Sequence, residues 1–183
     1  MQRISLLLLV LVVFSATVIQ VQAQAPKPGP EVKKLHVWVG HWTYEEQDTP
    51  GPWGPGGKVS GEYNGQMILA GFFFQGQWKE RGATGEAEAL VIDGYSPVSK
   101  GFTSNVYWDD GTILTGTVSL RGRTFDWAGK GLIAGKQYLL KGQIILAADL
   151  MSFTETFEIS SDGRMWAPFS EAKYTKTKPI PKR

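Results

Sequence analysis

The sequence contains no cysteine and only two histidines, and each shortage excludes a class of chemistry. Without cysteine there can be no disulfide, thiolate metal site or thiol nucleophile. His36 and His41 lie across a predicted helix-to-strand break, whereas zinc sites usually take three or four ligands. The Gly-x-Ser-x-Gly and His-Glu-x-x-His motifs and a phosphate-binding loop are also missing. We therefore expect a protein that is not an enzyme and that has no metal or other cofactor.

The chain also lacks a strong charge of either sign. It has 19 basic and 17 acidic residues, whereas a nucleic-acid-binding domain is strongly basic, so we expect no nucleic-acid partner. The one local excess is a cationic tail after Glu171, formed by Lys173, Lys176, Lys178, Lys182 and Arg183. This tail is either a solubilising end or a site of weak contact with anionic lipid headgroups.

Only one long apolar run is present, at residues 4–19, and it is short for a bilayer span of about 20 residues. Arg3 precedes it, and small-residue cleavage patterns that end at Ala23 and Ala25 follow it. This arrangement predicts a signal peptide over residues 1–25 and export to the periplasm or the medium. An uncleaved membrane anchor is the alternative.

The rest of the chain indicates one domain, with a linker and helix start at 26–34 and the domain itself at 35–178. Residues 31–39 can form about two helical turns, and turn signals then follow roughly every ten residues. Asp110-Gly111 and Asp162-Gly163 are hairpin signals. The predicted strands are 41–47, 58–64, 66–78, 86–95, 101–109, 111–120, 124–130, 137–148, 151–160 and 164–176. We predict an all-β fold, a single up-and-down antiparallel barrel of about ten strands with a short N-terminal helix.

Two segments depart from simple alternation. Residues 67–74 are apolar on both sides, so something must cover their outer face, and we expect either the N-terminal helix or a second subunit to do so. The loop at 48–57 carries a lone aromatic residue, Trp53. Trp53 either packs on the end of the barrel or forms a lid over a cavity mouth.

Several short motifs resemble those of the bacterial domain-of-unknown-function family 1579. They are Gly40-x-Trp42, the run at 67–73, Gly94-Tyr95 with Ser99-Lys100, Trp108-x-Asp110-Gly111-Thr112, and Tyr174-Thr-Lys176. The resemblance covers nearly all of 35–176 and implies a calycin (lipocalin-like) barrel without implying an activity. Lipocalins place an arginine from the last strand over the first-strand Trp, so Lys173, Lys176 or Arg164 would make that contact with Trp42 here. Related haem-binding barrels need a histidine on a late strand, which this chain lacks.

Alternation within strands predicts which side chains face the interior. In 151–160 the inward set is Met151, Phe153, Glu155, Phe157 and Ile159. Three of these residues and four inward-facing residues of other strands are expected to form a ligand pocket. The predicted pocket residues are Trp42, Tyr44, Val106, Trp108, Phe153, Glu155 and Phe157. Glu155 is the polar member of this set, and it either pairs with Lys141 or Arg164 or orients a ligand.

Two functions fit these features. The first is an exported, non-catalytic binding protein that holds a small apolar or amphipathic ligand inside the barrel. The second is a solid-cored, envelope-associated interaction protein that uses the apolar strand 66–74 and the cationic tail. Either one fits a monomer or a homodimer. The volume of the barrel interior distinguishes the two functions, because a bound ligand needs an internal cavity and an interaction protein does not.

Overall fold

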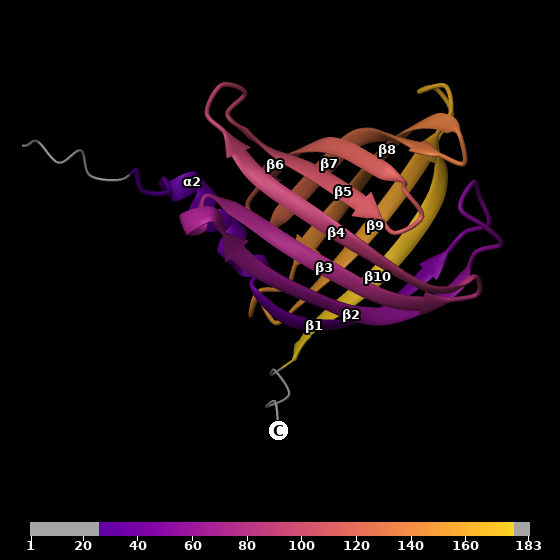
Figure 1. Ribbon diagram of the computed structural model, residues 1–183, viewed down its shortest axis with the longest axis horizontal. Helices are drawn as coiled ribbons and strands as arrows, with labels where there is room; N and C mark the ends of the chain where they lie inside the picture. The colour runs from indigo at the N-terminus through magenta and orange to yellow at the C-terminus, as the bar shows by residue number, and fades with distance from the viewer. Residues whose placement is uncertain (1–25, 178–183) are drawn as a thin grey trace, which may run out of the picture.

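The computed structural model describes residues 26–177, so the predicted signal peptide at 1–25 and the end of the tail at 178–183 lie outside the described residues. Ten antiparallel strands follow one another around a closed barrel, and β1 pairs with both β2 and β10 (Figure 1). The strands are β1 Gly40–Asp48, β2 Gly57–Ile68, β3 Phe73–Gly82, β4 Gly85–Ser96, β5 Gly101–Trp108, β6 Ile113–Arg121, β7 Thr124–Ile133, β8 Lys136–Leu146, β9 Ser152–Ser160 and β10 Ala167–Thr177. The predicted all-β, up-and-down fold is confirmed.

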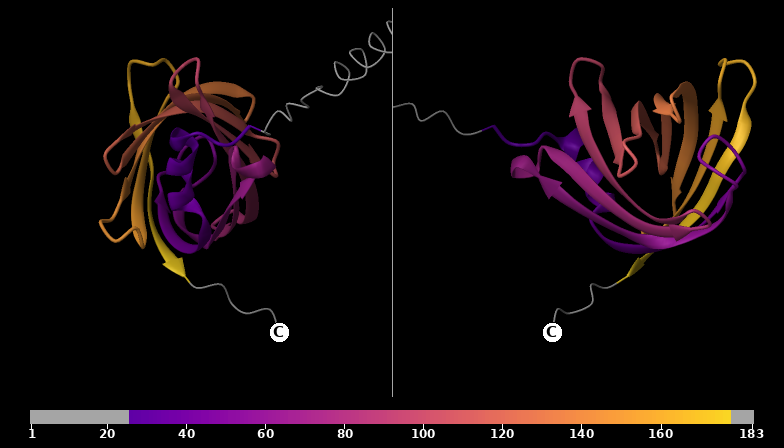
Figure 2. Two further views of the ribbon diagram at one scale, coloured as in Figure 1. Left: turned by 90° about the vertical axis from the view of Figure 1, so that its left-hand side faces the viewer. Right: turned by 45° about the vertical axis from the view of Figure 1, so that its right-hand side comes forward.

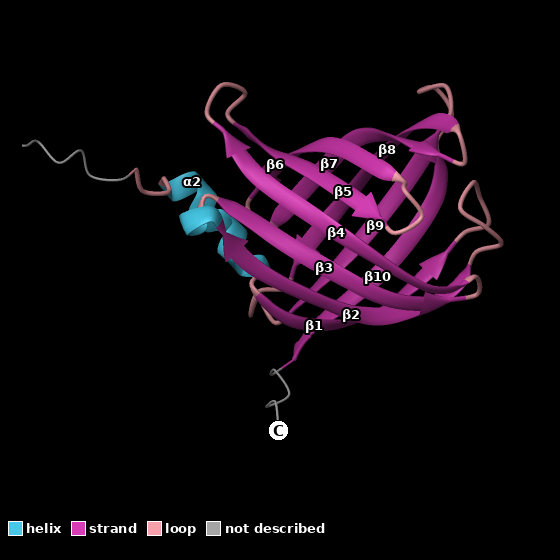
Figure 3. Cartoon of the chain, viewed as in Figure 1, coloured by secondary structure: helices cyan, strands magenta, loops and turns pink. Residues whose placement is uncertain are grey.

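A short helical segment closes one end of this barrel (Figures 2 and 3). It begins as α2, Pro30–Lys33, where a proline suits the first helical turn, and tightens into the 3₁₀ helix η1, Lys34–Trp38. Leu35 and Trp38 are buried, and the Trp38 ring packs edge-on against Phe125 and Phe153 at centroid distances of 4.8 and 5.0 Å. No helix among residues 26–177 is long and apolar enough to cross a membrane.

The helical segment therefore covers the barrel end, and it leaves Leu69 and Phe73 exposed, so it is not the cover expected over the outer face of residues 67–74. Coverage by a second subunit stays a prediction. The predicted strand 66–78 was wrong. β2 runs on to Ile68, a 3₁₀ turn η2 occupies Leu69–Gly71, and β3 begins at Phe73. Leu69, Ala70 and Gly71 all have positive φ, and Leu69 is 69% exposed. The middle of the apolar run is thus a hairpin turn, and this turn lacks the usual proline, asparagine or aspartate signals.

Both predicted Asp-Gly hairpins are present, although their turns are longer than two residues. Only the glycines, Gly111 and Gly163, have positive φ. The aspartates instead accept backbone hydrogen bonds, from Thr112 to Asp110 Oδ1 at 2.7 Å and from Arg164 to Asp162 Oδ1 at 2.8 Å. The side chain thereby stabilises the turn that its sequence predicts.

The Gly-x-Trp motif at the start of β1 has a direct structural explanation. Trp42 is fully buried and its Nε1 donates to the Trp38 carbonyl oxygen at 3.1 Å, which fixes η1 to the barrel. The Nζ of Lys176 lies 4.9 Å from the centroid of the Trp42 ring, so Lys176 supplies the expected cation–π contact. A Cβ at position 40 would approach the Lys176 Cε to 2.7 Å, and Gly40 has φ +133°. Glycine is therefore required for the lysine to reach the ring.

Candidate functional site

A cavity of about 490 Å³ occupies the barrel interior. Leu35 and Trp38 of the helical segment border its closed end. Residues of the β1–β2 loop, the β3–β4 turn and the β5–β6 turn border the opposite end, which forms the mouth. Ligand sites in proteins typically have volumes of roughly 300–1,000 Å³, so this cavity is large enough for a small organic molecule.

Aromatic rings form much of the cavity wall. In register across β1, β10 and β9, the rings of Tyr44, Tyr174 and Phe153 stack at centroid distances of 4.6 and 4.2 Å. The Nε1 of Trp78 donates to the Tyr174 hydroxyl at 3.2 Å and so links β3 to this stack. The lining aromatic residues are Trp38, Tyr44, Trp53, Tyr63, Trp78, Phe102, Trp108, Phe125, Trp127, Phe153, Phe157, Phe169 and Tyr174.

The structure brings most of the predicted pocket residues together. Six of them line the cavity, namely Tyr44, Val106, Trp108, Phe153, Glu155 and Phe157. Trp42 does not, because it lies beneath the cavity floor, with its ring edge-on to Phe153 at 5.0 Å. Of the other residues predicted to face inward, Ile159 is buried, while Met151 precedes β9 and is 49% exposed.

Glu155 has neither of the ion-pair partners suggested by the sequence. Lys141 instead pairs with Glu158, at 3.0 Å between Nζ and Oε2, and its ammonium lies 4.4 Å from the Trp166 ring centroid. Arg164 lies in the β9–β10 turn. Within residues 26–177 no basic side chain makes a salt bridge with Glu155, and burial raises its pKa to about 7.

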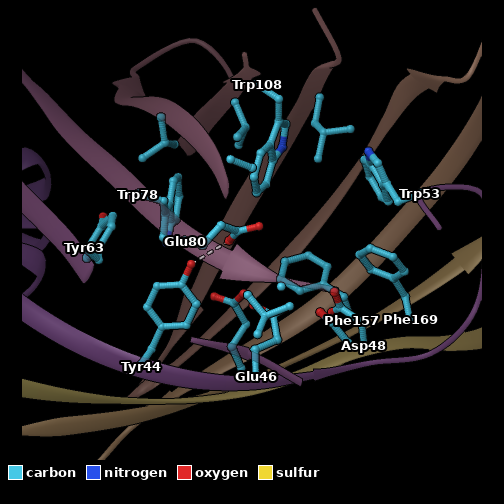
Figure 4. Close-up of a pocket in the computed structure, with 18 of the residues that line it drawn as sticks. Tyr44, Glu46, Asp48, Trp53, Tyr63, Trp78, Glu80, Trp108, Phe157 and Phe169 are labelled. Atoms are coloured by element: carbon cyan, nitrogen blue, oxygen red, sulfur yellow. Dashed lines mark hydrogen bonds between the residues drawn. The ribbon is translucent and has the colours of Figure 1, made fainter. Parts of the chain in front are cut away.

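Four further carboxylates in the cavity wall were missed in the sequence: Glu46, Asp48, Glu80 and Asp93. Alternation in β1 could have identified two of them, since Trp42, Tyr44, Glu46 and Asp48 share one face of the strand. Figure 4 shows Tyr44, Glu46 and Glu80 pointing toward one another from β1 and β3.

Burial and mutual repulsion raise the pKa values of these carboxyl groups. Burial is the largest cause for Glu46, followed by the charges of Glu155 and Asp48, and together they raise its pKa to about 9. Burial raises the pKa of Asp93 to about 7, although a hydrogen bond from Ser104 opposes the shift. The pKa values of Asp48 and Glu80 also rise, mainly through burial. The cavity is therefore a site where carboxyl groups titrate near neutral pH.

No basic side chain offsets these acids within the cavity. Of the described residues that line it, none is Lys, Arg or His. Three more carboxylates, those of Glu86, Asp109 and Asp110, lie toward the mouth. Among residues 26–177 no group of three or more His, Asp or Glu side chains is arranged to hold a metal ion.

Trp53 lies at the mouth and fits both interpretations of its loop. Its ring packs against Phe169 at a centroid distance of 4.8 Å, and it also borders the cavity (Figure 4). Packing on the barrel end therefore leaves the ring at the mouth of the cavity.

One solved structure of a known protein supports this fold. The crystal structure of Rv2717c from M. tuberculosis superposes with a TM-score of 0.60 at 14% identity, covering 83% of this chain and 100% of that one. A de novo designed fluorescence-activating β-barrel gives a TM-score of 0.41 at 13% identity, covering 76% of this chain and 93% of the designed one. No curated protein matches the sequence. Residues 27–176 match the family described as protein of unknown function DUF1579, and this chain belongs to that family.

Proposed function

We propose that this protein binds a small apolar or amphipathic molecule inside its barrel and does so without catalysis. The observation that carries the proposal is the cavity of about 490 Å³ lined by aromatic side chains. Such concave, largely apolar sites with a few polar groups are where proteins commonly hold small ligands. Burial of a ligand's apolar surface against these rings would provide most of the affinity.

The alternative, a solid-cored interaction protein, has less support. It requires inward side chains that fill the barrel, whereas the rings of Tyr44, Tyr174 and Phe153 stack along the wall. It also requires a continuous apolar strand at 66–74, whereas that segment is the end of β2, a turn and the start of β3. Within the cationic tail, Lys176 is already in contact with Trp42.

We further propose that the ligand enters between Trp53 and the β3–β4 turn and that the protein acts after export. The helical segment and Trp42 close the other end of the barrel. The export proposal rests on the sequence pattern of residues 1–25.

A neutral fluorescent probe tests the binding function. N-phenyl-1-naphthylamine should increase in fluorescence on binding to the wild-type protein with a saturable, one-site titration. Val106→Phe places a ring inside the cavity and should weaken binding by at least about tenfold, which corresponds to about 1.4 kcal/mol. Asn105→Phe adds the same ring one residue away, on the opposite face of β5, and should bind as the wild type does.

Equal loss in both variants, or no saturable binding by the wild type, would contradict an interior site. If the interior site is supported, native mass spectrometry of protein purified from its own cell envelope would identify the natural ligand as a mass that departs on activation.

A further inference from the structure

The acidic and apolar parts of the cavity wall come from different strands. The carboxylates lie on β1, β3, β4, β9 and the β5–β6 turn. Strands β6, β7 and β8 contribute only apolar side chains to the wall, and these are Leu114, Val118, Phe125, Trp127, Leu140 and Ile144. A molecule inside the barrel therefore meets carboxylates on one side and hydrocarbon on the other.

Glu46 and Glu155 form the centre of the acidic side. In register, Glu46 on β1 pairs with Ala172 on β10, and Ala172 pairs with Glu155 on β9. The two backbones that carry the acids are thus separated by two strand spacings, about 10 Å. Ala172 lies between them with only a methyl side chain, and both carboxylates line the cavity on either side of it.

Other polar atoms in this wall also lack partners. Asp48 Oδ1, Asp93 Oδ1 and Trp108 Nε1 are shielded from solvent and have no hydrogen-bond partner among the described residues. Buried polar groups are nearly always hydrogen-bonded, so such atoms indicate that a bound molecule completes the site. Two of the three are carboxylate oxygens, which either a hydrogen-bond donor or a positive charge close by would compensate.

On the basis of the binding function proposed above, we propose that the ligand is an organic cation, an amine or quaternary ammonium group attached to an aromatic or aliphatic body. The cationic group would lie among Glu46, Glu80 and Glu155, and the apolar body would lie against β6–β8. The aromatic rings add to the attraction, since cations bind favourably over ring faces. A carboxylate ligand such as a fatty acid would be repelled, and a neutral ligand would leave the acids without a counter-charge.

Ligand charge would be coupled to protonation of the wall. The titratable groups that face the cavity are Glu46, Asp48, Glu80, Glu86, Asp93, Asp109, Asp110 and Glu155, with the hydroxyls of Tyr44, Tyr63 and Tyr174. Because every carboxyl among them is more negative at higher pH, affinity for a fixed cation should rise with pH. The affinity should increase from about pH 6 to about pH 10, since the pKa values of Asp93 and Glu155 are about 7 and that of Glu46 is about 9.

Three probes with one naphthalene body test the proposal by isothermal titration calorimetry of the purified protein. They are 2-naphthylmethyl-trimethylammonium, 2-naphthylmethanol and 2-naphthylacetate. At pH 8 the ammonium should bind at least about tenfold more tightly than the alcohol, and the acetate should bind most weakly. The ammonium has a fixed charge, so its weaker binding at pH 5.5 would report protonation of the protein alone.

Variants then locate the effect. Glu155→Gln and Glu46→Gln should each reduce the preference for the ammonium over the alcohol several-fold, with circular dichroism confirming the fold. Glu45→Gln removes an acid from the outer face of β1 and should leave that preference unchanged.

The outcomes separate this inference from the function on which it rests. If the alcohol or the acetate binds as tightly as the ammonium at pH 8, the cation inference is overturned while interior binding stands. If Glu45→Gln lowers the preference as much as Glu155→Gln does, the attraction is a surface effect and the inference is again overturned. Failure of all three probes and of N-phenyl-1-naphthylamine would overturn the proposed function as well.

Discussion

The hydroxyl of Tyr44 donates a 2.6 Å hydrogen bond to Glu80 Oε2, and the two residues reach each other across Gly61. In register, Gly61 of β2 lies between Tyr44 of β1 and Glu80 of β3. A Cβ at Gly61 would approach the Tyr44 Cε1 to 2.9 Å and would overlap the Lys79 carbonyl oxygen. The absence of a side chain at one position therefore lets an aromatic ring and a carboxylate meet inside the cavity wall.

Gly61→Ala should consequently destabilise the protein by about 1–3 kcal/mol, the usual cost of overpacking. The measurement is the free energy of unfolding from urea denaturation. Gly101→Ala is the matched control, because the nearest atom to its added Cβ would be 3.8 Å away. We expect the control to change stability by less than about 0.5 kcal/mol. Equal effects would show that Tyr44 does not need the space over Gly61.

Trp42→Ala should lower the free energy of unfolding by about 3–5 kcal/mol, because it removes a fully buried ring from the closed end of the barrel. Lys176→Met keeps the aliphatic chain and removes only the cation over the ring, so it should cost less, on the order of 1 kcal/mol. Urea denaturation measures both. A neutral Trp42→Ala would mean that the Gly-x-Trp motif has no role in holding the helix.

Stability should fall as pH rises from 5 to 8. The carboxyls of Asp93 and Glu155 have folded pKa values of about 7, above their ordinary values, so the folded state binds more protons than the unfolded state in this range. Their stabilising contribution is complete below about pH 4 and is lost as pH rises through the folded pKa. The melting temperature at pH 8 should therefore lie below that at pH 5.

The double variant Asp93→Asn/Glu155→Gln should reduce this pH dependence without abolishing it, because the pKa values of Glu46, Asp48 and Glu80 are also raised. Glu155→Gln alone should keep or raise stability at pH 8. Glu45→Gln, on the outer face, should retain the wild-type slope. Asp126 and Asp162 have lowered pKa values, so their contributions to the pH dependence of stability lie below pH 4, outside the range measured. A melting temperature that rises from pH 5 to 8 would show that the interior carboxyls are not desolvated.

Trp53→Ala should accelerate both association and dissociation of N-phenyl-1-naphthylamine if the ring lies in the ligand's path. Stopped-flow fluorescence measures the two rates. Stability should change far less than in Trp42→Ala, since Trp53 is only half-buried and packs mainly on Phe169. Unchanged rates would place the route of entry elsewhere.

The mature exported protein should begin at Gln24 or Pro26, because the predicted cleavage sites follow Ala23 and Ala25. N-terminal sequencing of protein recovered after export measures this directly. Recovery of Met1 would instead support an uncleaved membrane anchor.

Much of the fold could be predicted because strand formation depends on local patterns. Two-residue alternation in 101–109 and 151–160 placed Val106, Trp108, Phe153, Glu155 and Phe157 on the inner face, and all five line the cavity. The prediction failed at 66–74, where a run of apolar residues resembles a strand but forms a turn. Only the pairing of β2 with β3 reveals this turn, since its residues carry few local turn signals.

The amino-acid sequence by itself determined that the chain alternates into strands, that Gly40 and Trp42 begin the first one, and that Glu155 faces inward. These properties follow from the residue types and their spacing. Only the tertiary structure decided that Glu46, Glu80, Asp93 and Glu155 line one cavity without a basic partner, that Lys141 pairs with Glu158, and that Trp42 lies below the floor. Closure of the barrel brings together strands that are far apart in the chain. Contacts across the interior therefore depend on the register of these strands and on where small side chains leave space. Alternation within a single strand gives no information about either.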